Sequence, residues 1–394
     1  MTLSAGGKPE ILFATIAAGG SHVSSAEAMA QAVEAEYPGR YRLELSDLMK
    51  DYGFERLDAR HKRSWQAALG RPWTITWGQR LIDRMPGATV AAHRLLLRTF
   101  ARRAAALLTE RQPRLVVANH GWLTTALTLS QRSFGLRVPV LTFQTSTLDA
   151  TALWAEPGAE RFMLGSPVAK EILVRLGVGR DKIDVVGYPV RQAFLRAPSK
   201  AQARAKLGLQ EHFTCLVSLG GEGVGGRPLE QLQTLRQLEF PVQVVVIAGR
   251  NAELTRQLGV LTRHDPLLRA EGFVTNMADF VAASDVVIGK TGPAAVFESL
   301  AVGRPVLAPH RSGGIENKLI DFLGAHELGG YVPTPDALKG AVRAYYTDPE
   351  RLSQVERRAR QFDFPDMTGR VGRYIAHYAE TRHPDLSLVG NGIS

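Results

Sequence analysis

Short runs of apolar residues alternate with amphipathic helical segments along almost the whole chain, and this alternation limits the possible folds more than any other feature. The runs in the first half are ILFATI, YRLEL, LVVAN, PVLTF and RFMLG, and those in the second half are TCLVSLG, VQVVVIAG, AEGFV, DVVIG and PVLAP. Such runs are typical of buried strands in parallel sheets that helices cover on both faces. Two successive sets predict an α/β protein with two Rossmann-like domains whose parallel sheets face each other across a cleft.

The length of 394 residues fits this division, because about 150–200 residues suit one domain. A strand ends at Gly187 and the next begins near Thr214, so the joint is expected around residues 190–200. We predict an N-terminal domain over residues 1–195 and a C-terminal domain over residues 196–365. Residues 366–394 are predicted to form a C-terminal helix and a frayed tail.

Cysteine content and hydropathy indicate the compartment. Cys215 is the only cysteine, so the sequence predicts neither an internal disulfide nor a cysteine-based metal site, as suits a reducing cytoplasm. No stretch approaches the roughly 18–20 apolar residues that span a bilayer. The early run ILFATIAAGG is interpreted as a first strand, not a signal peptide.

A basic helical stretch from Arg56 to Arg111 contains many of the positive charges behind the net charge of +10. Arginines beside tryptophans suit a helix that enters a lipid headgroup layer, which predicts contact with an anionic membrane surface. The alternative is an ordinary basic face packed on its own domain. No nucleic-acid-binding pattern is visible, so no nucleic acid partner is expected. The residues assigned to this surface are Arg63, Trp65, Trp73 and Trp77.

Ligands of doubly wound sheets bind beyond the carboxyl ends of the strands, so the loops after strands are the candidates for a site. The first such loop contains Gly20, Ser21 and His22 and leads into a helix. Its glycines allow close approach of a ligand, and His22 is placed where a general base could act. The alternative is a glycine turn of no catalytic importance.

A second loop, from Gly220 to Gly226, is rich in glycine. Glycines cost backbone entropy, so we interpret Gly220, Gly221, Glu222 and Gly223 as a place where backbone N–H groups approach a phosphate or sugar. The loop lacks the Lys-Ser/Thr ending of a P-loop, which argues against ATP or GTP hydrolysis.

A third loop, with Lys290, Thr291, Gly292 and Pro293, lies between a strand and a helix that contains Glu298. Pro293 suits the first helical turn. The N–H groups and dipole of this helix, with Lys290, predict a pyrophosphate site. Glu298 is predicted to accept both ribose hydroxyls, the alternative being a solvated helix carboxylate.

Two further loops extend this prediction. Arg250 follows an apolar strand and is expected to contact a phosphate. Phe273 and Val274 follow another strand and are expected to pack against or read the edge of a base.

Together these motifs resemble the diacylglycerol glycosyltransferases of the monogalactosyldiacylglycerol synthase type, which are related to the peptidoglycan N-acetylglucosaminyltransferase. The resemblance extends from Ile11 to about Phe322 and implies the GT-B fold. It implies that His22 lies near the acceptor hydroxyl and that the loop from Lys290 to Glu298 binds the donor. It further implies diphosphate contacts at Gly220–Gly223 and uracil contacts at Phe273 and Val274.

The chain also departs from the family pattern. The family has an Asp just after the strand that here ends in Phe143, and Asp149 is the candidate replacement. Trp154 matches a family tryptophan that faces the acceptor, but the histidine expected before it is missing. In the late Gly-Gln-Glu motif Glu316 is retained, while Ile315 replaces the glutamine that would help to hold the sugar. The sugar and the acceptor therefore stay open.

The predicted function is an inverting glycosyltransferase that moves a sugar from a UDP-sugar to a lipid hydroxyl, with diacylglycerol as the implied acceptor. His22, or else Asp149, is the expected base; the UDP-sugar is a co-substrate, and no cofactor or metal is expected. The predicted location is the cytoplasm, peripherally on the inner face of the cell membrane, and the oligomeric state stays open. The alternatives are a UDP-sugar epimerase and a non-catalytic protein that binds a sugar nucleotide or a lipid.

Overall fold

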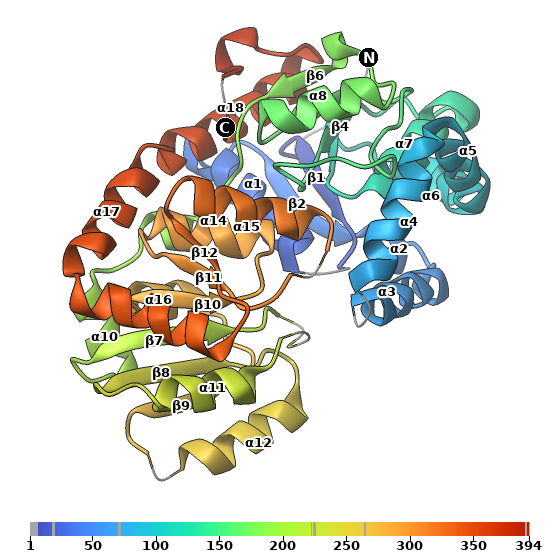
Figure 1. Cartoon of the computed structure of the whole chain (residues 1–394). Coiled ribbons are helices and arrows are strands. Elements are labelled where there is room, and N and C mark those ends of the chain that lie inside the picture. The colour runs from blue at the N-terminus through green and yellow to red at the C-terminus, as the bar shows by residue number, and fades with distance from the viewer. Residues whose placement is uncertain are drawn as a thin grey trace. The chain divides into compact units, whose positions relative to one another are not determined.

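The chain forms two compact α/β units in a computed structural model (Figure 1). The structure describes residues 7–17, 20–69, 72–221, 223, 226–263, 265–311, 313–390 and 392–393. Unit 1 comprises Met1–Arg191 and Pro365–Ser394, and unit 2 comprises Gln192–Phe364. Each unit is described by itself below.

Unit 1 has a parallel six-stranded sheet in the order β2-β1-β3-β4-β5-β6. Its strands are β1 (Glu10–Thr15), β2 (Arg42–Asp47), β3 (Leu115–Ala118), β4 (Val140–Phe143), β5 (Arg161–Leu164) and β6 (Ile183–Val185). Ala14 near the end of β1 pairs with Ala118, the last residue of β3. The loops that follow these two strands therefore begin side by side.

The helices of unit 1 cover both faces of this sheet (Figure 1). They are α1 (Gly20–Glu36), α2 (Leu48–Asp51), α3 (Glu55–Leu69), α4 (Pro72–Arg84), α5 (Pro86–Leu96), α6 (Arg98–Arg111), α7 (Gly121–Phe134), α8 (Pro167–Arg175) and α18 (Phe364–Thr381). The stretch predicted as helical from Arg56 to Arg111 is divided into several helices. Pro86 begins α5, as suits a residue without an N–H, and Leu97 separates α5 from α6.

Unit 2 has a second parallel six-stranded sheet, in the order β12-β11-β10-β7-β8-β9. Its strands are β7 (Phe213–Ser218), β8 (Val242–Ile247), β9 (Leu268–Glu271), β10 (Val286–Gly289), β11 (Val306–Ala308) and β12 (Gly329–Tyr331). Its helices are α9 (Gln192–Leu195), α10 (Lys200–Leu207), α11 (Pro228–Arg236), α12 (Ala252–Thr262), α13 (Met277–Ala283), α14 (Pro293–Ala301), α15 (Ile315–Ala325), α16 (Pro335–Thr347) and α17 (Pro349–Arg360).

The core of unit 2 is formed by the continuous apolar runs of its central strands. β8 is buried at every position, and Cys215 of β7 lies in the same cluster. Burial raises the pKa of the Cys215 thiol, so it remains an uncharged core residue. Ser218, Ile247, Glu271 and Gly289 pair across four neighbouring strands, which brings the loops after β7, β8, β9 and β10 to one edge of the sheet.

The two parallel sheets confirm the predicted fold class, but the end of the chain differs from its prediction. Residues 365–394 belong to unit 1, the predicted C-terminal helix is α18, and described residues after this helix are hydrogen-bonded to unit 1 where a frayed tail was predicted. Asp184 of β6 accepts hydrogen bonds from Arg161 (2.7 Å) and from the hydroxyl of Tyr374 in α18. The N–H groups of Gly390 and Ile393 donate to carbonyls of Val185 and Gly165. These contacts, made between distant parts of the sequence, hold the terminal segment against β5 and β6.

Among the residues that the structure describes, none of the helices is both long and apolar enough to cross a bilayer.

Candidate active site

The loops predicted to bind the donor all lie at the carboxyl edge of the unit 2 sheet. Two glycine loops there approach each other too closely for side chains. Gly223 and Gly249 have φ angles of 64° and 61°, in the left-handed region. A β-carbon added at Gly223 would lie 1.9 Å from the carbonyl oxygen of Ala248, and one at Gly249 would lie 2.5 Å from that of Gly220. Glycine is therefore required at both positions. The predicted Glu222 lies outside the described residues.

Arg250 and Phe273 form one exposed group next to this glycine loop. The Arg250 guanidinium carbon lies 4.2 Å from the centre of the Phe273 ring, and the Arg250 N–H donates to the carbonyl oxygen of Gly221 at 2.9 Å. The Phe273 side chain is 51% exposed, and Val274 beside it is half-buried. An exposed aromatic ring with a cation on its face is suited to stacking against a planar ligand.

Lys290 and Glu316 were predicted separately, and the structure brings them together. Lys290 Nζ lies 2.8 Å from Glu316 Oε1, and the buried hydroxyl of Thr291 donates to the Glu316 carbonyl oxygen at 3.2 Å. These contacts join the loop after β10 to the beginning of α15. They place a cation directly before α14, whose first helical residue is Pro293.

Helix α14 has the features of an anion site at its N-terminus. Gly292 is its N-cap and provides no side-chain cap, so the first N–H groups of the helix are not capped by that residue. The positive end of the helix dipole adds to the charge of Lys290. Glu298 lies in the same helix and is 6% exposed, which contradicts the alternative of a solvated carboxylate.

His310, in the loop after β11, is a member of this site that sequence reasoning missed. A β-carbon added at Gly226 would lie 3.1 Å from His310 Cε1, so the loops after β7 and β11 are in contact. Burial lowers the His310 pKa, while Glu316 raises it and Lys290 lowers it. His310 Nδ1 and Glu316 Oε2 are buried without a hydrogen-bond partner among the described residues.

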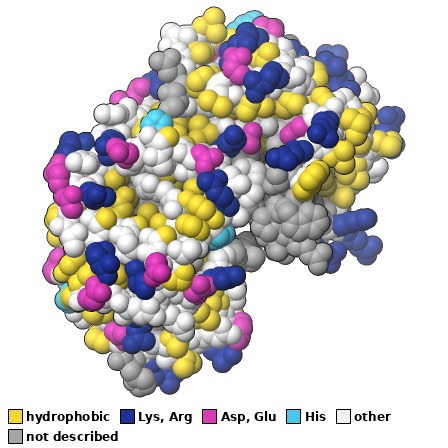
Figure 2. Space-filling model, in the orientation of Figure 1, with side chains coloured by type: hydrophobic (Ala, Val, Ile, Leu, Met, Phe, Trp, Pro, Cys, Tyr) yellow, Lys and Arg dark blue, Asp and Glu magenta, His cyan; other side chains and the backbone are white. Residues whose placement is uncertain are grey.

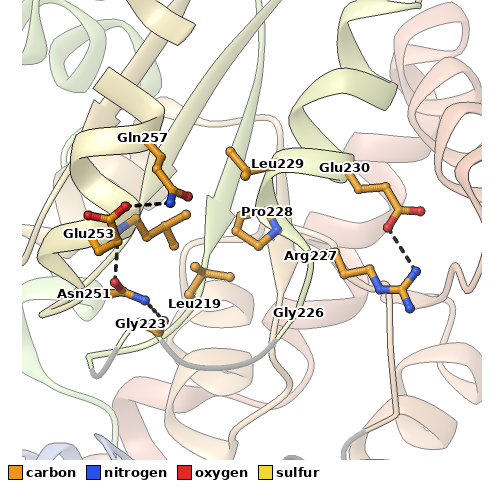
Figure 3. A pocket seen from close by; sticks show the side chains of 11 residues that line it. Leu219, Gly223, Gly226, Arg227, Pro228, Leu229, Glu230, Asn251, Glu253 and Gln257 are labelled. Atoms are coloured by element: carbon orange, nitrogen blue, oxygen red, sulfur yellow. Dashed lines mark hydrogen bonds and ion pairs between the residues drawn. The ribbon is translucent and has the colours of Figure 1, made fainter. Parts of the chain in front are cut away.

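A hollow of about 550 Å³ lies beside the glycine loop, within unit 2 (Figure 3). Leu219, Pro228, Leu229 and Leu254 form apolar lining between the N-terminal ends of α11 and α12. Asn251 binds the backbone here, accepting from Leu254 N–H (3.0 Å) and donating to the Gly223 carbonyl oxygen (3.1 Å). The size of the hollow suits a small-molecule ligand.

In unit 1, the predicted base His22 is held by the residue that follows β3. The two contacting atoms, His22 Nδ1 and the backbone oxygen of Asn119, are 2.7 Å apart. The Asn119 amide group donates to the His22 carbonyl oxygen and to the Ser25 hydroxyl. The half-buried Ser21 and the first residue of α1, Gly20, precede His22. Asn119 was not predicted, although a polar residue directly after a buried strand is a signal for it.

These contacts define the proton position on His22. A carbonyl oxygen can only accept a hydrogen bond, so Nδ1 of a neutral His22 carries the hydrogen. The lone pair of that ring is then on Nε2. A histidine in this tautomer can accept a proton through Nε2.

A second histidine, His120, lies next to His22 and was also missed. The two ring centres are 4.8 Å apart. Trp154, which is 6% exposed, lies 6.3 Å from the His22 ring and 6.4 Å from the His120 ring. The structure thus places the predicted Trp154 against both histidines, and Trp122 lies 6.4 Å from His120.

Asp149 and Trp154 share the loop after β4, and Asp149 makes hydrogen bonds within this segment. Its carboxylate accepts from the Ala150 N–H at 2.9 Å, and its carbonyl oxygen accepts from Gln144. In the same loop, the Thr145 hydroxyl lies 3.4 Å from His22 Nδ1. The loop after β4 thus contributes Thr145 and Trp154 to the surroundings of His22.

The same loop is attached to the helices of the basic stretch. Asp83 of α4 accepts a hydrogen bond from the Ala152 N–H at 2.6 Å. Arg94 of α5 forms a two-bond ion pair with Glu156, whose side chain is fully buried. The position of Trp154 thus depends on α4 and α5.

The outer face of α4 and α5 carries apolar and basic side chains together. Trp77, Leu81 and Leu95 are 64%, 57% and 77% exposed, and Arg80 and Arg84 are exposed beside them. Figure 2 shows hydrophobic and basic side chains next to each other at the right-hand edge, where Figure 1 places these helices. Arg63 of α3 is exposed as well. The side chains of Trp65, Trp73 and Ile315 lie outside the described residues.

Comparison with known proteins gives related sequences over most of the chain. Residues 227–313 match the glycosyltransferase family 28 C-terminal domain. Monogalactosyldiacylglycerol synthase 2, chloroplastic, of Arabidopsis thaliana is 26% identical over 95% of this chain and 81% of its own length. Monogalactosyldiacylglycerol synthase, chloroplastic, of Spinacia oleracea is 25% identical over 83% of this chain, which spans 64% of that relative.

Solved structures share the fold at low identity. Anabaena Alr3699/HepE, solved with UDP-glucose, has a TM-score of 0.54 and 17% identity, over 94% of this chain and all of that one. A Listeria monocytogenes protein described as a UDP-N-acetylglucosamine 2-epimerase has a TM-score of 0.60 and 13% identity, over 96% of this chain and 99% of that one.

Two parallel-sheet units, the second of which matches the glycosyltransferase family 28 C-terminal domain over residues 227–313, indicate a glycosyltransferase of the GT-B fold. The chain is, more particularly, a glycosyltransferase related to the monogalactosyldiacylglycerol synthases.

Proposed function

We propose that this glycosyltransferase moves a sugar from a UDP-sugar to the hydroxyl of a lipid, with diacylglycerol as the acceptor, and inverts the anomeric configuration. The names of the synthases above support the acceptor, and the complex of HepE with UDP-glucose supports the donor. The UDP-sugar is a co-substrate, and neither another cofactor nor a metal ion is required.

In this proposal the donor binds at the carboxyl edge of the unit 2 sheet. The N-terminus of α14 and Lys290 hold the pyrophosphate, with Gly220–Gly223 on its other side. Glu298 accepts the ribose hydroxyls, and Phe273 and Val274 contact the uracil. Glu316, paired with Lys290, lies where a sugar hydroxyl can reach a carboxylate. Arg250, next to the glycine loop, adds a positive charge.

The observation that carries the proposal is the orientation of His22. His22 Nδ1–H donates a hydrogen bond to the backbone carbonyl oxygen of Asn119, so Nε2 can accept the proton of the acceptor hydroxyl. The hydroxyl oxygen bonds to the anomeric carbon from the face opposite UDP, and the bond from that carbon to the β-phosphate oxygen breaks. The charge on the departing UDP is stabilised by α14 and Lys290.

The acceptor reaches unit 1 from the inner face of the cell membrane. The exposed Trp77, Leu81 and Leu95 with neighbouring arginines suit a layer of anionic headgroups. The contacts from Asp83 and Arg94 to the loop of Trp154 connect this surface with the histidines.

Transfer of labelled sugar to diacylglycerol in anionic vesicles tests the proposal, with UDP-glucose, UDP-galactose, UDP-N-acetylglucosamine and UDP-glucuronate as donors. We expect His22→Ala to lower kcat by about 10²-fold or more, because the general base is lost. UDP affinity should be unchanged, and transfer should persist in EDTA. His383→Ala, which replaces an exposed histidine, is the matched control.

The rival functions give different results in the same assay. An epimerase, whose fold is equally compatible, would convert the free UDP-sugar without lipid. A binding protein would retain UDP and release no product. Near-wild-type turnover of His22→Ala would remove His22 from the mechanism.

A further inference from the structure

Lys290 is the cation that the proposed function assigns to the pyrophosphate, and in the structure it pairs with Glu316. Lys290 Nζ lies 2.8 Å from Glu316 Oε1, and the two side chains are 25% and 15% exposed. An ion pair that is shielded from water is screened less than one on the open surface. A pyrophosphate that binds Lys290 therefore competes with the Glu316 carboxylate.

Removal of Lys290 would leave the Glu316 carboxylate without a cation. Its second oxygen, Oε2, is buried and has no hydrogen-bond partner in the part of the chain that the structure describes. The buried Thr291 hydroxyl donates to the carbonyl oxygen of the same residue at 3.2 Å, so the start of α15 is tied to the loop after β10. Because a shielded carboxylate without a cation is unfavourable, we expect Glu316 to pair with another positive group.

His310 is a side chain that can become this positive group. Its Nδ1 is buried and also lacks a hydrogen-bond partner among the described residues. A β-carbon added at Gly226 would lie 3.1 Å from His310 Cε1 and 3.6 Å from Nδ1, so the ring lies against the glycine loop after β7. An imidazole nitrogen can take up a proton, and the resulting N–H can donate to a carboxylate oxygen.

The charges around His310 determine the direction of this change. Burial lowers the His310 pKa below that of an ordinary histidine, while Glu316 raises it and Lys290 lowers it. Two cations of the adjacent loops are themselves in ion pairs, Arg227 with Glu230 at 3.2 Å and Arg311 with Asp321 at 2.7 Å. When Lys290 binds a pyrophosphate, negative charge offsets the cation that lowers the pKa while Glu316 remains, so the His310 pKa rises.

We propose that the pyrophosphate of the donor takes Lys290 from Glu316, and that His310 then takes up a proton from solvent and pairs with the Glu316 carboxylate. This inference rests on the proposed function. His310 is in this role a positioning residue, which holds Glu316 near the sugar after Lys290 has turned to the phosphates. Binding of a UDP-sugar is thereby coupled to proton uptake, and the donor binds more tightly at mildly acidic than at alkaline pH.

Calorimetric titration of the full chain with UDP-glucose measures this proton, because the heats in two buffers of different ionisation enthalpy differ in proportion to the protons taken up. UDP-glucose is suitable because its pyrophosphate keeps its charge in this range, whereas the terminal phosphate of free UDP titrates at about pH 6. We expect uptake of up to about one proton per bound UDP-glucose at pH 6.5 and little at pH 8.0. The apparent Kd should weaken by up to about tenfold per pH unit between them.

Three variants test which groups take part. His310→Gln and Glu316→Gln should each abolish the proton uptake, whereas the control His212→Gln should keep it. His212 directly precedes β7, at the opposite edge of the unit 2 sheet. Uptake that persists in His310→Gln would assign the proton to another group, and uptake that persists in Glu316→Gln would assign it to the ligand charge alone. Either result overturns the inference.

Histidine ¹⁵N NMR gives a second measurement on the wild-type protein. The His310 ring, assigned by comparison with His310→Gln, should change from neutral to doubly protonated when UDP-glucose is added at pH 6.5; a ring that stays neutral contradicts the inference. Binding of UDP-glucose without proton uptake overturns the inference alone. If the wild-type protein binds none of the four UDP-sugars named above, the proposed function fails and the inference fails with it.

Discussion

His310 is a half-buried side chain at the carboxyl edge of the unit 2 sheet, and the direction of its pKa shift predicts a sensitivity to pH. Its ring contacts Gly226, and its Nδ1 is buried without a hydrogen-bond partner among the described residues. Burial lowers the pKa below that of an ordinary histidine, so the ring is neutral at pH 7. In the unfolded chain the same ring takes up a proton near pH 6.5.

This difference predicts an acid-labile unit 2. The contribution of the neutral ring to the free energy of unfolding is fully present above the pKa that His310 has in the unfolded chain. It is lost as the pH falls below that pKa, because the unfolded state then binds more protons than the folded state. We expect His310→Gln to reduce the drop in Tm between pH 7.5 and pH 5.0. The control is the exposed His383→Gln. An unchanged drop in His310→Gln would show that other groups cause the acid loss.

At the residue scale, the sequence indicates which residues are candidates for a site but not which other residues they contact. His22, Lys290 and Glu316 can be selected from the sequence because each follows a buried strand or begins a helix, and their roles stay predictions. Asn119 and His120 were missed because LVVAN reads as a single strand, although β3 ends one residue earlier. The contact between Asn119 and His22 joins positions 97 residues apart, which no local pattern encodes.

At the scale of elements, the N-terminus of α7 restricts the position of the loop that contains Trp154. A β-carbon added at Gly121 would lie 2.3 Å from the carbonyl oxygen of Leu153, closer than real contacts allow. Only glycine lets the helix start and the loop approach so closely. This approach holds Trp154 against His120.

We therefore expect Gly121→Ala to push residues 151–154 away from α7. Overpacking of this kind costs about 1–3 kcal/mol in the free energy of unfolding. Transfer to lipid should fall more than UDP binding, since the proposed donor site belongs to unit 2. Gly87→Ala in α5, where an added β-carbon meets nothing within 4 Å, is the control. Equal activity of the two variants would contradict the role of Gly121. Activity assays and denaturant unfolding provide the two measurements.

The elements themselves follow from local patterns where the patterns are strong. The apolar runs predict most strands because a strand buried on both faces needs them. β12 was missed, since Gly329, Gly330 and Tyr331 contain no β-branched residue, and its place is fixed by pairing with β11. The breaks within the stretch from Arg56 to Arg111 were missed because helical periodicity continues across them.

At the scale of the whole molecule, the outer face of α4 and α5 predicts how the protein meets its substrate. We expect the double variant Trp77→Ala/Leu81→Ala to bind anionic vesicles about tenfold more weakly, because two exposed apolar side chains no longer enter the headgroup layer. Transfer to lipid in vesicles should fall with it, at unchanged UDP affinity. Vesicle co-sedimentation and the transfer assay measure both.

The control for this surface is Leu386→Ala, an equally exposed apolar residue elsewhere in unit 1. Binding of the double variant at the wild-type level would place membrane contact elsewhere. Loss of binding in both would indicate nonspecific adsorption.

The return of the chain from unit 2 to unit 1 has a consequence for biosynthesis. Unit 2 is one continuous segment, so it can fold as soon as residue 364 has left the ribosome. The sheet of unit 1 is synthesised first, but some of its hydrogen bonds form only later. The bond between Asp184 and Tyr374 needs α18, and the bonds of Val185 and Gly165 need Gly390 and Ile393. The unit that is translated first is therefore completed last, and a nascent chain arrested before residue 365 carries an incomplete unit 1 and a complete unit 2.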